Sequence, residues 1–157
     1  MTDKDLNIAL REMARKAGLC DKWYEEWKDD DSIDVCLDRA IRGFDFCVKC
    51  DYPPLDFIRE NFRKEDLHRH NIYIDEDVDI KGAGSGYYVF LGNCTGSIEA
   101  HGFSVVSCYL RHDSRVDVTS LGSARLFVSY YDNSSGNTFR DEWGRIRTYD
   151  RRKKEGE

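Results

Sequence analysis

The second half of the chain repeats an alternation of apolar and polar positions. Residues 78–133 read as three similar stretches that begin at Val78, Ile98 and Val116, about twenty and then eighteen residues apart. Each stretch opens apolar-charged-apolar, and a second alternation follows about ten residues later. Two short strands in each repeat are typical of a β-solenoid, in which one coil buries its inward row only against its neighbours. The pattern therefore predicts a short right-handed β-solenoid over residues 69–150.

The first half shows helical spacing instead. Apolar residues recur every three or four positions over residues 3–17, between a capping Thr2 and a terminating Gly18. A short helix is expected over residues 20–28, and a clear apolar stripe runs from residue 33 to residue 48 after Ser32. Pro54 fits the first turn of a fourth helix that reaches residue 62. We expect an α+β chain whose helical segment, residues 1–68, covers one end of the solenoid.

An antiparallel β-sandwich or another β-roll is the alternative fold. Short alternating strands with turn signals about every ten residues fit a sandwich as well. The solenoid interpretation requires Val78, Ile98 and Val116 to stack in one buried column, so that nonadjacent strands at these positions would contradict it. Residues 151–157 are expected to form a basic tail outside either fold.

Composition narrows the class of protein. The chain has 157 residues, enough for one domain or two small halves, and a formal net charge of −6. An acidic balance disfavours nonspecific binding to nucleic acid, although the tail concentrates arginine and lysine. No apolar run approaches the roughly 20 residues that span a bilayer, and the first residues lack the apolar centre of a signal peptide. We therefore expect a cytoplasmic protein without membrane or nucleic-acid partners.

Four cysteines form a weak candidate for a zinc site: Cys20, Cys36, Cys47 and Cys50. Four thiols within about thirty residues can hold zinc in a tetrahedral arrangement. A structural zinc site usually pairs two closely spaced motifs, however, and only Cys47 and Cys50 form one. Cys36 and Cys47 also fall on the apolar stripe, where packing already accounts for them. We expect core packing and no metal or other cofactor.

The outward positions of the predicted solenoid suggest a contact surface. With successive coils offset by eighteen residues, Leu91, Tyr109 and Phe127 form one outward row, and Arg111 and Arg125 flank it. An exposed apolar and aromatic row beside arginines is typical of a protein–protein contact. The row could equally pack on the helical half, join copies of the chain or bind a foreign partner. The predicted contact residues are Tyr109, Arg111, Arg125 and Phe127.

No catalytic signature accompanies these patterns. The glycine-rich run at residues 82–86 precedes a strand and not the helix that a phosphate-binding loop requires. We therefore expect a non-enzymatic binding or assembly module that associates with itself through solenoid faces. One alternative is a protein that sequesters a small anion or nucleotide at a subunit interface lined by Arg111 and Arg125. The other is a carbohydrate-active enzyme of the solenoid kind.

Several phrases of the helical half resemble a known group of proteins. They are GLC at residues 18–20, IRGFDFC at residues 41–47 and DFIRENF at residues 56–62, followed by the β-repeat half. Together they are similar to small uncharacterised proteins of gut anaerobic bacteria and of their phages and mobile elements. The resemblance covers most of the chain and implies a helical cap on a β-repeat, with a phage or mobile-element origin. It implies no activity and no site residues.

Overall fold

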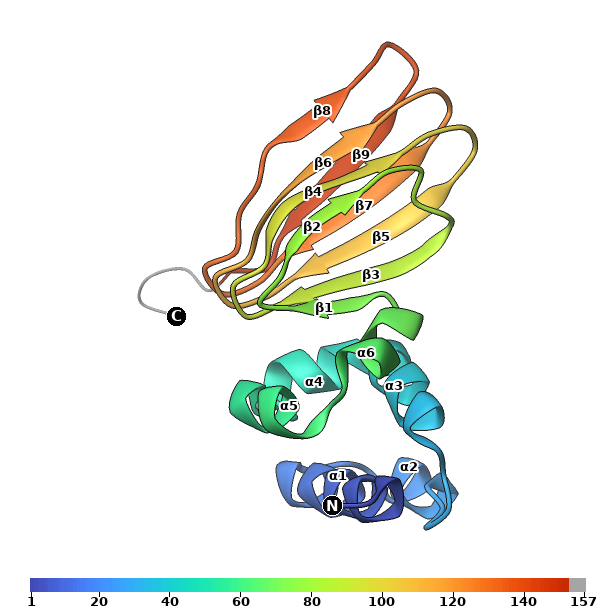
Figure 1. Cartoon of the computed structure of the whole chain (residues 1–157), viewed down its shortest axis with the longest axis vertical. Coiled ribbons are helices and arrows are strands. Elements are labelled where there is room, and N and C mark those ends of the chain that lie inside the picture. Colours follow the sequence, from blue (N-terminus) through green and yellow to red (C-terminus); the bar gives the residue numbers. More distant parts are fainter. Residues whose placement is uncertain (153–157) are drawn as a thin grey trace. The chain divides into compact units, whose positions relative to one another are not determined.

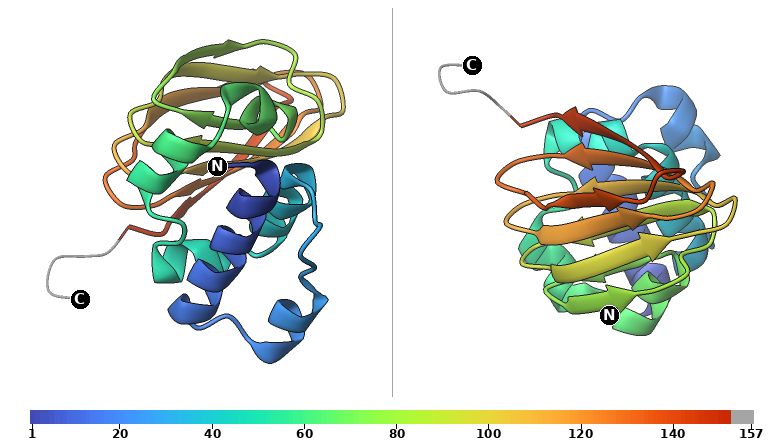
Figure 2. Two further views of the ribbon diagram at one scale, coloured as in Figure 1. Left: turned by 60° about the horizontal axis from the view of Figure 1, so that its bottom comes forward. Right: turned by 90° about the horizontal axis from the view of Figure 1, so that it is seen from above.

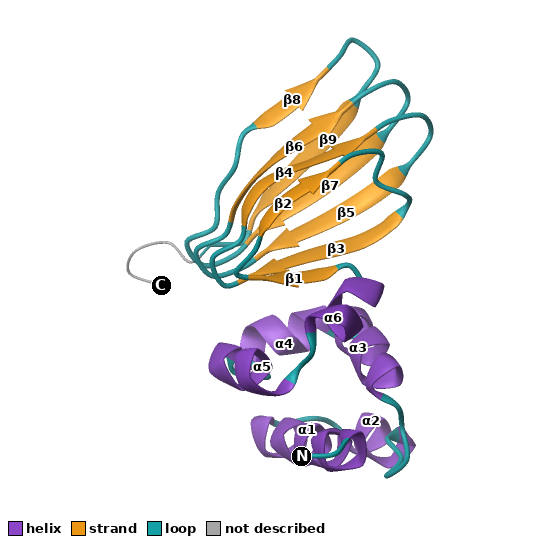
Figure 3. Cartoon of the chain, in the orientation of Figure 1, coloured by secondary structure: helices purple, strands orange, loops and turns teal. Residues whose placement is uncertain are grey.

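The computed structural model describes residues 1–152 of the chain and divides it into two compact units (Figure 1). The first unit spans Met1–His70 and contains the helices, whereas the second begins at Asn71 and contains the strands (Figure 3). The expected boundary between residues 68 and 69 lies two residues before this division. Residues 153–157 of the expected basic tail lie outside the described part of the chain.

Six helices make up the first unit. Thr2 caps the first of them in both directions, since its hydroxyl accepts from the Asp5 N–H and its own N–H donates to the Asp5 carboxylate. Gly18 ends this helix in the left-handed conformation, at φ 110°. The helices are α1 (Asp3–Ala17), α2 (Asp21–Glu26), α3 (Ile33–Arg42), α4 (Phe44–Cys50), α5 (Leu55–Asn61) and α6 (Lys64–Arg69).

Two differences from the expected four helices have local causes. The helix expected after Ser32 breaks at Gly43, whose φ of −103° and ψ of 33° depart from helical values. Its apolar stripe is therefore shared between α3 and α4. The polar stretch that follows the fourth expected helix forms a further helix, α6, in which Leu67 is buried and Glu65 and Asp66 lie in the first turn.

The second unit is a β-solenoid of about four turns. Each turn adds one strand to each of two sheets, and every strand pair in the described chain is parallel (Figures 1 and 2). The odd sheet comprises β1 (Ile72–Ile74), β3 (Gly86–Leu91), β5 (Val105–Leu110), β7 (Arg125–Tyr130) and β9 (Arg145–Asp150). The even sheet comprises β2 (Asp77–Ile80), β4 (Thr95–Ala100), β6 (Arg115–Ser120) and β8 (Thr138–Arg140). The solenoid prediction is confirmed, and the antiparallel sandwich is excluded by the parallel pairing.

The predicted stacking register was wrong by two residues. Val78, Ile98 and Val116 do lie on adjacent strands, but Val78 pairs with Gly96, and Gly96 in turn pairs with Val116. Ile98 belongs to the next inward column, beside Ile80. The predicted alignment of the three repeats placed apolar residues opposite apolar residues and overlooked the glycine in the column. Gly96 is required because a Cβ there would lie 1.9 Å from the Val78 carbonyl oxygen, and its φ is 112°.

The inward row changes character along the solenoid. In the middle coils it consists of fully buried apolar side chains such as Val118 and Val128. In the last coil the paired positions are Thr138 and Thr148, both exposed. Polar residues at these positions suit a coil that no further coil covers within the described residues.

One turn of each coil carries a residue in the left-handed region. These residues are Asp75, Gly92, His112 and Asp132, with φ values of 54°, 67°, 58° and 56°. Two of these residues link neighbouring coils through their side chains, since Asp132 Oδ2 accepts from the His112 N–H at 3.0 Å and His112 Nδ1 accepts from the Gly92 N–H at 3.0 Å. The turns therefore hold the coils in register by side-chain bonds to the backbone as well as by the strands.

Candidate binding sites

The outer surface of the odd sheet combines arginines with aromatic side chains. On β5, β7 and β9 the outward positions include no aspartate, glutamate or lysine, although the whole chain is acidic. Exposed arginines alternate with half-buried rings, and Val105 is 47% exposed. We call this surface the arginine–aromatic face; its members are Val105, Tyr109, Arg125, Phe127, Arg145, Arg147 and Tyr149.

Tyr109 and Phe127 both lie on this face, but the row that was expected to join them does not exist. Tyr109 pairs with Val89 on one side and Ser129 on the other, whereas Phe127 pairs with Ser107. The two rings occupy neighbouring columns because consecutive coils of this sheet are offset by twenty residues and not by eighteen. Tyr109 stacks instead on Tyr87, with 6.0 Å between ring centroids.

The two predicted arginines have different surroundings. Arg125 is exposed at the start of β7, whereas the Arg111 side chain is only 8% exposed and its Nε donates to Asp132 Oδ2 at 3.1 Å. Burial by itself would raise the pKa of Asp132, but the His112 N–H and the Arg111 charge together lower it. Arg111 aligns with Tyr131, six residues beyond Arg125, so the two arginines stand about 20 Å apart along the strand direction. One chain therefore does not bring them into a single anion site.

Two highly exposed aromatic residues were missed by the sequence analysis. Phe103 is 88% exposed and Trp143 is 71% exposed, each in the turn that precedes an odd strand. Ser123 occupies the corresponding position of the turn between them. An aromatic residue, a serine and a second aromatic residue recur at a spacing of twenty residues. They fall on turns, however, and alternation along strands does not point to turn positions.

The even sheet has the opposite charge on its outer surface. Its outward positions on β2, β4 and β6 hold four carboxylates and one arginine. Two of the carboxylates accept hydrogen bonds from the next coil, since Asp77 Oδ1 accepts from the Thr95 hydroxyl and Asp117 Oδ1 accepts from the Asn137 N–H. We call this surface the acidic face; its carboxylates are Asp77, Asp79, Glu99 and Asp117.

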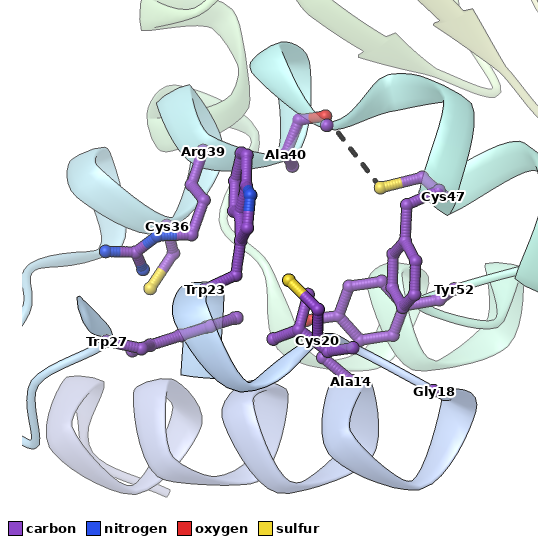
Figure 4. Close-up of a pocket in the computed structure, with 13 residues that line it drawn as sticks. Ala14, Gly18, Cys20, Trp23, Trp27, Cys36, Arg39, Ala40, Cys47 and Tyr52 are labelled. Atoms are coloured by element: carbon purple, nitrogen blue, oxygen red, sulfur yellow. Dashed lines mark hydrogen bonds between the residues drawn. The ribbon is translucent and has the colours of Figure 1, made fainter. Parts of the chain in front are cut away.

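A separate hollow of about 340 Å³ lies inside the helical unit (Figure 4). Residues of α1, α2, α3, α4 and the adjoining loops surround it, and all of them belong to the first unit. The wall is aromatic, thiol and small-aliphatic apart from one guanidinium group, and its members are Ala14, Gly18, Leu19, Cys20, Trp23, Trp27, Cys36, Arg39, Ala40, Gly43, Phe46, Cys47 and Tyr52.

A buried polar network fixes one wall of this hollow. Asn7 is fully buried on α1, and its Oδ1 accepts from Trp27 Nε1 at 2.6 Å and from Cys36 Sγ at 3.0 Å. Its Nδ2 donates to the carbonyl oxygens of Lys28 and Asp29. Since one amide group makes four hydrogen bonds, the Trp27 ring is held in a fixed orientation.

Arg39 supplies the charge beside the hollow. Its guanidinium lies 4.5 Å from the Trp27 ring centroid, and its Nη2 donates to Asp31 Oδ2 at 2.9 Å. The Arg39 and Asp31 side chains are 12% and 14% exposed, so their ion pair is largely withdrawn from water. Arg39 Nη1 is buried, and no acceptor among the described residues reaches it.

The four cysteines proposed as a weak zinc site are not gathered into one. The described residues contain no group of three or more histidine, cysteine, aspartate or glutamate side chains that could hold a metal. Cys36 donates to Asn7, Cys47 to the Ala40 carbonyl and Cys50 to the Ala17 carbonyl, while Cys20 is exposed. Burial raises the pKa of Cys36 to about 11, which keeps its thiol protonated near neutral pH.

The geometry of these sites has no counterpart among the known proteins that were compared with the chain. No family model, curated protein or solved structure matches the chain. In the described part of the chain, no helix is both long and apolar enough to cross a membrane. The sites above are therefore interpreted from their own charge, burial and packing.

Proposed function

We propose that the chain is a non-enzymatic assembly module whose arginine–aromatic face docks on the acidic face of a second copy. The observation that carries this proposal is the opposite charge of the two outer surfaces of one solenoid. The arginine–aromatic face presents Arg125, Arg145 and Arg147, with no carboxylate at the outward positions of β5, β7 and β9, whereas the acidic face presents four carboxylates. Complementary potentials favour this pairing and disfavour a face meeting itself.

The composition of the arginine–aromatic face supports a protein partner. Aromatic residues and arginine are enriched in protein–protein interfaces, where lysine, glutamate and aspartate are depleted. Tyr87 and Val105, at 50% and 47% exposure, leave apolar surface in water that docking would bury. Because two different faces meet, the association is heterologous and adds copies in a row unless the row closes into a ring.

The alternatives receive less support. Sequestration of a small anion between Arg111 and Arg125 requires a free Arg111, but that side chain already pairs with Asp132. The solenoid-enzyme alternative rests on analogy of fold alone. We place the assembly in the cytoplasm, where free thiols such as those of the six cysteines stay reduced. Its phage or mobile-element origin follows from the resemblance alone and is tested by the genes that neighbour it.

Two charge-reversal variants test the proposal. R125E/R147E blocks the arginine–aromatic face, and D79K/E99K blocks the acidic face. We expect the wild-type chain to associate in a salt-sensitive manner and each variant alone to be a monomer by light scattering coupled to gel filtration. A mixture of the two variants should give a 1:1 dimer, because each still carries one intact face.

The control K49E/K64E introduces the same change of charge as R125E/R147E, but in the helical unit at exposed positions, and should associate like wild type. A wild-type chain that stays monomeric would refute the proposal. Self-association by D79K/E99K alone would show instead that the arginine–aromatic face meets itself. Circular dichroism confirms that each variant is folded before its mass is interpreted.

A further inference from the structure

The buried polar side chains in the wall of the hollow are already engaged within the helical unit. Trp27 Nε1 and Cys36 Sγ both donate to Asn7 Oδ1, at 2.6 Å and 3.0 Å. Cys47 and Tyr52 donate to backbone carbonyl oxygens. A polar ligand group placed against these side chains would lose its water without gaining a partner, which weakens binding. The wall therefore favours a ligand without hydrogen-bonding groups.

The one guanidinium group in the wall does not favour a charged ligand. Arg39 Nη1 is buried out of reach of a ligand in the hollow, and Nη2 donates to Asp31 at 2.9 Å. An anion would add excess negative charge to this balanced pair in a poorly solvated place. A cation drawn to the Trp27 ring would meet the Arg39 charge, which lies 4.5 Å from the ring centroid. The favoured ligand is therefore uncharged.

The size and lining of the hollow favour fused aromatic rings. Its volume is about 340 Å³, and an apolar cavity of about 150 Å³ already accommodates one benzene ring. Aromatic rings gain from edge and offset contacts with other rings, and sulfur atoms also pack favourably against rings. The rings and thiol groups of the wall belong to Trp23, Trp27, Phe46, Cys20, Cys36 and Cys47 (Figure 4).

A ligand can enter this hollow from solvent. Gly18 and Cys20 belong to the lining and are exposed, so they mark its mouth. Asn7 fixes the orientation of the Trp27 ring at the inner wall, so less order has to be imposed when a ligand binds.

We propose that the helical unit binds an uncharged, planar aromatic hydrocarbon of about two fused rings that carries no hydrogen-bonding group. The rings lie among Trp23, Trp27 and Phe46, and the affinity comes from apolar surface withdrawn from water. This site is independent of self-association through the solenoid.

A matched set of compounds tests the proposal on the full chain. Binding is followed by fluorine NMR, with 1-fluoronaphthalene as the reporter that each compound displaces. We expect naphthalene to bind roughly tenfold more tightly than 2-naphthol, whose hydroxyl group finds no partner in the wall. Tetralin, which keeps the carbon skeleton but has only one aromatic ring, should bind roughly threefold more weakly than naphthalene. Equal or tighter binding of 2-naphthol or tetralin, or no binding of naphthalene, would overturn the proposal.

Variants locate the binding within the hollow. Ala40→Phe places a ring in the hollow from α3 and should abolish naphthalene binding. Val35→Phe adds the same ring at an exposed position of α3 and should leave binding unchanged. Unchanged affinity in a folded Ala40→Phe variant contradicts the site.

Thiol alkylation provides a test that needs no substitution. Saturating naphthalene should slow the reaction of Cys20 with iodoacetamide, measured by peptide mass spectrometry, because the bound rings cover the mouth of the hollow. Cys50 is partly exposed but does not line the hollow, so its reaction should stay the same. An unchanged rate at Cys20 under saturation would place the ligand elsewhere and overturn the proposal.

Discussion

The two units of this chain differ in how their small cores are packed. The solenoid stacks the same inward positions coil after coil, and Phe90, Val106 and Leu126 are at most 1% exposed. The helical unit is held partly by a buried polar network around Asn7, and it leaves a hollow of about 340 Å³ among its helices. The interior of a repeat is filled because the inward side chains of each coil pack against the equivalent side chains of the next coil. Short helices of different lengths converge without that periodicity.

This difference separates the units by role. Under the proposed function, the filled, repetitive core makes the solenoid a rigid support for its two oppositely charged outer faces. The helical unit, by contrast, keeps an aromatic-walled hollow among its helices. The two units are therefore tested by different substitutions. In the solenoid a side chain is added where the backbones approach closely, and in the helical unit a buried hydrogen-bonding side chain is removed.

The largest expected effect concerns backbone fit in the solenoid. Gly96→Ala would place Cβ 1.9 Å from the Val78 carbonyl oxygen at a φ of 112°, so we expect a loss of more than about 4 kcal/mol or no folded solenoid. Gly84→Ala is the matched control, because a Cβ there meets nothing within 4 Å. Urea unfolding followed by circular dichroism measures both. Similar stability of the two variants would contradict the register.

A smaller effect is expected from the polar network of the helical unit. Asn7→Leu keeps the volume of the side chain but leaves Trp27 Nε1 and two carbonyl oxygens without their partner, at a cost of about 2–4 kcal/mol. Asn61→Leu removes one local bond to the Phe57 carbonyl and should cost less than about 1 kcal/mol.

Unfolding of the helical unit in urea is measured by tryptophan fluorescence. Trp143 of the solenoid is first replaced by phenylalanine, so that it adds no signal. Trp23 and Trp27 then remain as reporters beside the hollow. A wild-type unfolding midpoint in Asn7→Leu would mean that the network does not hold the wall.

The smallest effect concerns acid sensitivity in the solenoid turns. Burial opposes the charged form of Asp132, but the His112 N–H and the Arg111 charge outweigh it, so that the pKa of Asp132 is lowered on folding. A carboxylate with a lowered folded pKa stabilises the native state above its unfolded pKa of about 3.9, and that stability is lost as the pH falls through the folded value.

Asp132→Asn should therefore reduce the difference in unfolding midpoint between about pH 6 and about pH 3, a range that spans the unfolded pKa. Asp113→Asn is the control, since it removes a carboxylate from a neighbouring turn position. Identical acid sensitivity of Asp132→Asn and wild type would show that the turn carboxylate does not link folding to protonation.

The sequence foresaw much of the fold because caps and periodicity are local signals. Thr2, Gly18 and Ser32 mark helix ends through bonds to residues close in the chain. The period near twenty residues indicated stacked coils, since each coil needs the same inward positions. The register was missed where a glycine interrupts the apolar column, because only the close approach of the Val78 carbonyl explains Gly96.

The candidate sites depended more on tertiary structure. Alternation along strands was enough to place Tyr109 and Phe127 on one outer face. It could not show that Arg111 is paired with Asp132 of the next coil, twenty-one residues away. The hollow gave no sequence signal, because its walls come from four helices that meet only in three dimensions.

The amino-acid sequence by itself determined where the helices capped by Thr2 and Ser32 begin, that the second half repeats, and which strand residues alternate outward, since each depends on neighbours a few positions apart. The tertiary structure decided which columns align, which face carries only positive charge, and where a donor is left unsatisfied. Those properties depend on distances between residues far apart in the chain, and local spacing does not encode such distances.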